Sequence, residues 1–278
     1  MTGLRPTASL ASAEAHGRSF VNSSAFEALA RAGFVARGLV YAIIGVLALK
    51  LAFGHGGKLT NQQGALKTVA HQPFGTVLLV LVAIGLGGYS LWRVVRAAIG
   101  HGPEGSDTGF ERVAALASGL AYGALCALAV EIVVSGHSGT SGSPKKATAG
   151  VFGWPGGTWI VGIAGGVMIG VALYQGYRGI SHRFLKDSKV EQMKPEVKKW
   201  ITRLGTVGHL ARMVVFGLVG IFLVKAAIDY NPKQAVGLDG ALAKLTHYSY
   251  GPVLLGIVAA GLIAFAVYSL SDARYRRI

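Results

Sequence analysis

Six long apolar stretches constrain this 278-residue sequence more than any other feature. Each is close to the roughly 20 residues that an α-helix needs to cross the hydrocarbon core of a bilayer. None shows the period-two alternation that the strands of a lipid-facing β-barrel require. The stretches therefore predict an all-α polytopic membrane protein with six transmembrane helices, at residues 33–53, 74–97, 113–134, 157–180, 207–228 and 252–270.

The composition agrees with a membrane protein. Charged residues make up 14% of the chain, against about 25% in soluble domains. The net charge of +15 could indicate nucleic-acid binding, but the basic residues flank apolar stretches instead of forming one basic domain. We therefore expect no nucleic-acid partner, and anionic lipid headgroups as the partners of these cations. The single cysteine, Cys126, lies in an apolar stretch and has no disulfide partner in the chain.

The distribution of Lys and Arg predicts the orientation. Nineteen of the 27 Lys and Arg residues fall on the side of the predicted spans that carries both termini. Since cytoplasmic loops carry the excess of Lys and Arg, both termini are expected in the cytoplasm. Residues 1–26 predict a disordered cytoplasmic tail. Residues 183–203 predict a basic, amphipathic cytoplasmic linker on the membrane surface, facing anionic lipid or an acidic partner.

An internal repeat organises the six stretches. Three segments align without gaps, "GFVARGLVYAIIGVLALKLA", "AALASGLAYGALCALAVEIV" and "GHLARMVVFGLVGIFLVKAA". Three more follow them, "GLGGYSLWRVV", "GVALYQGYRGI" and "GLIAFAVYSLS", each with two aromatic residues three apart. The repeating unit is therefore a helical hairpin, predicted at 27–98, 108–182 and 204–274. Because each unit has two spans, all three insert the same way, which predicts pseudo-threefold symmetry about the membrane normal.

The blocks "GFVARGLVYAIIG", "GHLARMVVFGLVG", "LYQGYRGISHRFLK" and "ARYRRI" carry a resemblance to a known family. Over about residues 27–274 the chain resembles a bacterial membrane family called domain of unknown function 1206. The resemblance implies three tandem two-helix units and a multi-pass protein of the bacterial cytoplasmic membrane. It implies no activity. The second unit departs from the pattern, with Ser118 in place of the Arg and Glu131 in place of the Lys.

Two repeated arginines are candidate contacts for an anion or a lipid headgroup. Arg37 and Arg212 occupy equivalent positions, about one turn inside the predicted cytoplasmic edge. The simplest expectation is that each side chain extends to the interface and meets a lipid phosphate. A role in binding an anionic substrate is the alternative.

A second candidate is a buried charge cluster near the outer leaflet. Lys50, Glu131 and Lys225 are equivalent in the repeat, and threefold symmetry would place them at one depth. A carboxylate within a bilayer is costly unless it is paired. The alternative is that the long lysine side chains simply reach the outer interface.

The remaining candidate residues, a group of glycines and a pair of histidines, are expected to have structural roles. Gly162, Gly166 and Gly170 form a ridge at spacing four, which predicts an internal helix–helix seam or an oligomer interface. His71 and His247 are equivalent and could hold a metal, but we expect loop capping, no metal site and no cofactor.

Three functions remain open at this point. The first is a non-enzymatic scaffold or accessory module that binds lipid or a membrane-protein partner. The second is a transporter or channel with a path along the pseudo-threefold axis. The third is an enzyme on a lipid-linked substrate, which would need Glu131, His71, His247 and Asp239 in one outer pocket.

Overall fold

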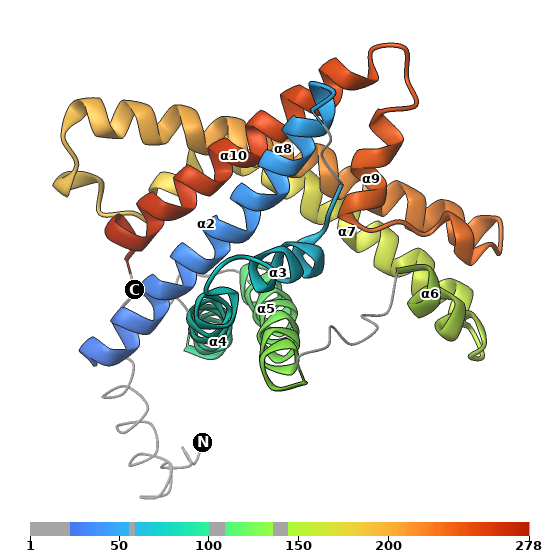
Figure 1. Ribbon diagram of the computed structural model, residues 1–278, viewed down its shortest axis with the longest axis horizontal. Coiled ribbons are helices and arrows are strands. Elements are labelled where there is room, and N and C mark those ends of the chain that lie inside the picture. Colours follow the sequence, from blue (N-terminus) through green and yellow to red (C-terminus); the bar gives the residue numbers. More distant parts are fainter. Residues whose placement is uncertain (1–22, 56–58, 100–108, 136–143, 278) are drawn as a thin grey trace, which may run out of the picture.

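A computed structural model describes residues 23–55, 59–99, 109–135 and 144–277 (Figure 1). In this part of the chain six helices are long and apolar enough to cross a membrane. This finding confirms the predicted set of six apolar helices. They are α2 (Ser24–Ala52), α4 (Gly75–Ile99), α5 (Gly109–Ser135), α7 (Gly157–Ile180), α8 (Pro195–Ile228) and α10 (Gly251–Tyr275).

Two boundaries differ from the prediction. The α2 helix begins at Ser24, where the Ser23 hydroxyl caps it by accepting a hydrogen bond from the Phe26 amide at 3.2 Å. Residues 1–22 of the predicted tail lie outside the described residues. The predicted basic linker is helical in its second half, which is the start of α8 and runs unbroken from Pro195 to Ile228. Its first half holds two short 3₁₀ turns, η1 (Arg183–Leu185) and η2 (Val190–Gln192).

Each hairpin carries a short helix between its two spans. These helices are α3 (Gln62–Ala70), α6 (Pro144–Phe152) and α9 (Leu238–Leu245), and they begin 82 and 176 residues apart from the first. A glycine opens each second span at the same spacing, namely Gly75, Gly157 and Gly251. A Cβ atom on any of the three would collide with a backbone carbonyl of the short helix before it. The repeating unit is thus two spans with a short helix wedged between them.

The contacts between successive units are built alike. At equivalent points a small residue of a first span meets a backbone carbonyl of another unit's second span: Gly45 meets Ala259, Cys126 meets Ala83, and Gly220 meets Gly165. The spacing of these carbonyls corrects the predicted alignment of the second unit by three residues. Tyr174, not Tyr177, is therefore the counterpart of Trp92. The error arose because Tyr174 and Tyr177 have the same spacing of three as Tyr89 and Trp92, whereas in the correct register Val171 is the counterpart of Tyr89.

The six spans form a ring that is open on one side. Packed pairs lead from α5 through α4, α2, α10 and α8 to α7, whereas α5 and α7 do not pack along each other in the described residues. In the first unit a Cβ on Gly33 would lie 2.8 Å from the Gly85 carbonyl oxygen, so this crossing needs glycine. The second unit has Ala114 and Val167 at these two positions. The close crossing is therefore blocked by side chains in the second unit.

The glycine ridge is not a continuous internal seam, which corrects that expectation. Of its three glycines, Gly162 alone lies at a contact with α8, where an added Cβ would be 3.5 Å from the Ala227 Cβ. A Cβ added to Gly166 or Gly170 would meet nothing within 4 Å. Gly165, one position away, makes the close contact with α8 instead. The residue that matters for packing is the one facing the neighbouring carbonyl, and the spacing of the glycines alone does not identify it.

The beginning of α2 and the end of α10 lie at the same end of the bundle (Figure 1). The Arg31 guanidinium of α2 donates a hydrogen bond to the Arg274 carbonyl of α10 at 2.8 Å. The described ends of the chain are therefore on one side of the six spans, as an even number of spans requires.

Candidate functional site

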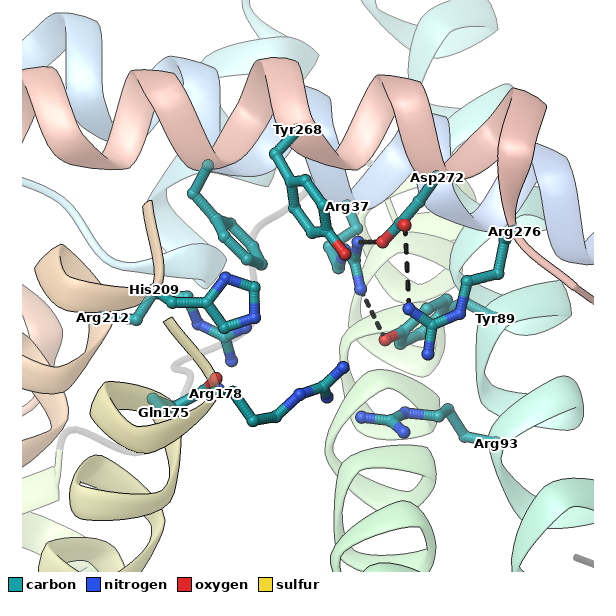
Figure 2. Close-up of a pocket in the computed structure, with 11 residues that line it drawn as sticks. Arg37, Tyr89, Arg93, Gln175, Arg178, His209, Arg212, Tyr268, Asp272 and Arg276 are labelled. Carbon is teal, nitrogen blue, oxygen red and sulfur yellow. Dashed lines mark hydrogen bonds and ion pairs between the residues drawn. The ribbon is translucent and has the colours of Figure 1, made fainter. Parts of the chain in front are cut away.

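A small cavity of about 40 Å³ lies inside the ring, near the end where α2 begins and α10 ends (Figure 2). Its volume has room for about three water-sized groups. Five of the six spans contribute to its lining, and α5 is the exception. The lining is rich in cations, and its charged side chains are Arg37, Arg93, Arg178, Arg212, Arg276 and Asp272.

Arg37 is the most completely bound of these arginines. It is 6% exposed and does not extend to the interface, which corrects the simplest expectation for it. Its guanidinium donates to Asp272 Oδ2 at 2.8 Å, to the Tyr89 hydroxyl at 2.8 Å and to Ser269 Oγ at 3.1 Å. A buried ion pair is retained only when its remaining hydrogen-bonding groups are satisfied. Arg37 therefore joins α2, α4 and α10 at one point.

The segment after α7 contacts residues that line the cavity, at the end of the bundle. Asp187 Oδ2 accepts hydrogen bonds from Arg178 at 2.9 Å and from Arg276 at 2.7 Å. Phe184 is fully buried, and its ring stacks on His209 with centroids 5.0 Å apart. Burial disfavours the charged form of Arg276, but Asp187 and Asp272 more than offset this and raise the pKa of Arg276. The segment is therefore held by charge as well as by packing.

Replacing Asp187 with Asn should loosen this segment. Two charge-assisted hydrogen bonds are weakened, which we expect to cost about 1–2 kcal/mol at a carboxylate that is partly exposed. Hydrogen–deuterium exchange of the detergent-solubilised protein should show faster amide exchange over residues 182–194 than in the unchanged protein. Glu191→Gln is the control, since its pair with Arg277 is exposed on the same segment. Equal exchange in both variants would contradict the role given to Asp187.

Arg93 and Arg212 have no carboxylate within ion-pair distance among the described residues. Arg93 Nε donates to Ser118 Oγ of α5 at 3.1 Å. Arg212 lies 4.4 Å above the Phe265 ring, and with its amide suitably oriented Gln175 accepts from Arg212 at 3.0 and 3.2 Å. The Arg212 Nε is buried without a hydrogen-bond partner. These two arginines supply positive charge that no carboxylate of the described residues balances.

The structure brings one predicted group of site residues together and leaves the other apart. Arg37 and Arg212, the repeated pair, line the same cavity and both lie over the Phe265 ring. Lys50, Glu131 and Lys225 do not form the predicted buried cluster. All three side chains are exposed, and no ion pair joins them in the described residues. Each is near the end of its span that is opposite to the described ends of the chain, where a long side chain can reach the interface.

The two equivalent histidines each contact a backbone carbonyl oxygen of the short helix that precedes them. His71 Nδ1 lies 2.7 Å from the Lys67 carbonyl oxygen, and His247 Nδ1 lies 2.9 Å from that of Ala243. Both contacts connect residues four apart at the end of the short helix between two spans, α3 or α9. Among the described residues no three His, Cys, Asp or Glu side chains gather as metal ligands.

Sequence reasoning missed four of the cavity's charged residues, Arg93, Arg178, Asp272 and Arg276. They stand at the ends of the second spans, where Lys and Arg were counted as flanking charge. In the alignment corrected by the structure, Arg178 and Asp272 are equivalent positions, so opposite charges of two units face the same interior. This signal depends on the corrected register, which the sequence alone did not provide.

Comparison with known proteins matches this architecture unit by unit. Residues 32–100, 113–182 and 207–276 each match the family described as Domain of Unknown Function (DUF1206). The chain is 33% identical over 253 residues to a Bacillus subtilis (strain 168) protein described as "Uncharacterized protein YxxB", covering 89% of this chain and 90% of that protein. No solved structure matches the chain. Since the three matched segments cover the three hairpins in order, the chain belongs to the DUF1206 family.

Proposed function

We propose that this protein is a non-enzymatic membrane module whose central cavity binds an anionic group, a phosphate or a carboxylate. The observation that carries the proposal is the excess of guanidinium groups around one small cavity. Five arginines line it, and two carboxylates, Asp272 and Asp187, pair with three of them. The two unpaired arginines are partly buried, and they therefore carry part of the several kcal/mol per ion that full burial of an unbalanced charge costs. A bound anion would remove that cost, and guanidinium groups bind phosphate and carboxylate in bidentate fashion.

The proposal includes an orientation and a symmetry. Both described ends of the chain are on one side, and the bias of Lys and Arg favours the cytoplasm for that side. The three alike contacts between units support a pseudo-threefold axis along the membrane normal, broken where α5 and α7 separate. The cavity would then face the cytoplasmic half of a bacterial cytoplasmic membrane. A membrane-protein partner remains part of this proposal.

Packing beyond the cavity supports binding in preference to conduction. Apolar side chains that are at most 1% exposed fill the interior of the ring toward its other end, including Ile44, Leu79, Leu255 and Leu262. A channel or a transporter needs a path or a polar site near the midplane of the membrane. The structure has a small polar cavity at one end of the ring and a dense apolar interior toward the other.

The test is stabilisation by an anion. We expect the thermal unfolding midpoint of the purified protein to rise with inorganic phosphate, compared with chloride at equal ionic strength, because ligands that bind the folded state stabilise it. Arg212→Gln should weaken the apparent phosphate affinity about tenfold through loss of one charge-assisted contact. It should not lower the midpoint without phosphate, since Arg212 pairs with no carboxylate in the described part of the chain.

Lys225→Gln is the matched control on the same helix, because Lys225 is exposed and lies outside the cavity. It should respond to phosphate like the unchanged protein. No stabilisation by phosphate over chloride, or an equal loss in both variants, would contradict the proposal.

A further inference from the structure

The cavity is next to the open side of the helix ring. Of the six spans, only α5 contributes no side chain to its lining, and α5 is also one of the two spans that fail to pack together. The spans on either side of α5 provide Arg93 and Arg178. Figure 2 shows these two side chains extending toward each other from α4 and α7. The side of the cavity between them is therefore the side that lacks a closed helix pair.

Equivalent positions show that this side is unusually accessible. Val82 and Val258 are 5% and 7% exposed, whereas their counterpart on α7, Ala164, is exposed. Gly85 and Gly261 are buried at helix crossings, whereas Val167, their counterpart on α7, is 60% exposed.

The α5 helix, across the gap from α7, is also more exposed than its counterparts in the other two units. Ala36 and Ala211 are 4% and 7% exposed, whereas their counterpart on α5, Ala117, is exposed. The seam, defined here as Ala117 and Ala121 of α5 with Ala164 and Val167 of α7, thus exposes surface that the other two units bury.

The seam is apolar along its length. Residues 113–130 of α5 and 157–177 of α7 include no charged side chain. In the second unit Ser118 also takes the place of the arginine that the other two units direct into the cavity. An uncharged, apolar opening therefore adjoins a cavity with excess positive charge.

We propose that the anion is the phosphate group of an anionic phospholipid, with its headgroup in the arginine cavity and an acyl chain along the seam. This inference rests on the proposed function and names the class of ligand. A free anion would balance the arginines but would leave the seam uncovered. An anionic lipid satisfies both, because it carries negative charge and apolar surface on one molecule. Its headgroup end also coincides with the end of the bundle where Lys and Arg accumulate.

The test separates the lipid from the free anion. The protein is reconstituted in nanodiscs of mixed phosphatidylglycerol and phosphatidylcholine, released into the gas phase, and its retained lipids are identified by native mass spectrometry. We expect selective retention of phosphatidylglycerol. Val167→Trp, which fills the seam, should reduce that retention about tenfold, the loss of roughly one strong contact. Stabilisation by inorganic phosphate should be unchanged in this variant.

Ile163→Trp is the matched control, one turn away on α7. Ile163 is 64% exposed, and its counterparts Leu81 and Ile257 are exposed too, so this position faces outward in every unit. It should retain phosphatidylglycerol normally.

The other possible outcomes distinguish failure of the lipid inference from failure of the proposed function. Phosphate stabilisation without selective lipid retention would overturn the lipid inference and leave the proposed function standing. Loss of both would overturn both. Retention that is unchanged by Val167→Trp would show that the seam is not the lipid site. A change from dimer to monomer in Val167→Trp, with lipid retention unaltered, would assign the seam to a second copy of the chain and also overturn the inference.

Discussion

Asp272→Asn is expected to lower the free energy of unfolding by about 3–5 kcal/mol, the cost of leaving one member of a buried ion pair alone. The Asp272 side chain is 2% exposed, and it pairs with Arg37 at 2.8 Å and with Arg276 at 3.7 Å. The asparagine keeps the shape and one hydrogen-bond acceptor but removes the charge. Arg37 would then be a buried cation in a cavity that already holds excess positive charge. The protein should lose stability chiefly through that unpaired guanidinium.

A double variant distinguishes lost charge from lost packing. Arg37→Met with Asp272→Asn removes both charges and should recover most of the stability, because apolar replacements of a buried pair are often neutral. Reversible unfolding in mixed micelles by titration with sodium dodecyl sulfate would give the free energies. Glu196→Gln, at an exposed acid in the first turn of α8, should change them by less than about 0.5 kcal/mol. If the double variant were as unstable as Asp272→Asn, the explanation by unpaired charge would be wrong.

The span-level fold could be predicted because hydropathy decides it. A bilayer accepts only segments whose backbone groups are all bonded internally, so an apolar stretch of about 20 residues has essentially one outcome. The hairpin repeat could also be predicted from the sequence, because its first spans align without gaps. The alignment register of α7 with the other second spans could not be predicted from the sequence. It depends on which face of α7 meets the Val224 and Gly220 backbone of α8, a contact between segments far apart in sequence.

The candidate site shows the same division. Arg37 and Arg212 could be selected because a charge within an apolar span is rare and therefore informative. Their neighbours Arg178 and Arg276 stand in basic segments, where a single arginine carries no signal. Lys50 and Lys225 had the same repeat support as the arginines but did not meet. Equivalent depth in a bundle brings side chains together only if they also face its interior, and these face outward.

The second unit explains why symmetry and function are separable here. Its short helix and its opening glycine follow the other units, so its architecture is retained. Ser118, Ala114 and Val167 are three of its departures, and their counterparts in the other units line the cavity or lie at the crossings that close the ring. A uniform repeat would bring a third arginine into the interior and would seal the α5–α7 pair. The substitutions in the second unit therefore lower the density of positive charge in the interior. They also leave the helix ring open between α5 and α7.

Gly33→Ala is expected to destabilise the protein by about 2–3 kcal/mol, although alanine is the better helix former. The new Cβ would lie 2.5 Å from the Tyr89 Cβ and 2.8 Å from the Gly85 carbonyl oxygen. Neither obstacle is the end of a flexible side chain, so α2 and α4 would have to separate. Separation would move Tyr89, whose hydroxyl is a partner of Arg37. The loss of packing would therefore extend to the cavity.

Gly166→Ala provides the matched control, a glycine in the middle of α7 whose Cβ would meet nothing within 4 Å. Without a collision, only helix propensity changes, and this variant should be neutral or gain up to about 1 kcal/mol. The sodium dodecyl sulfate titration should then place the two variants on opposite sides of the unchanged protein. Equal stabilities would mean that α2 and α4 do not approach as closely as the structure has them. In that case the glycines would not account for the sealed first unit, and their absence would not account for the open second one.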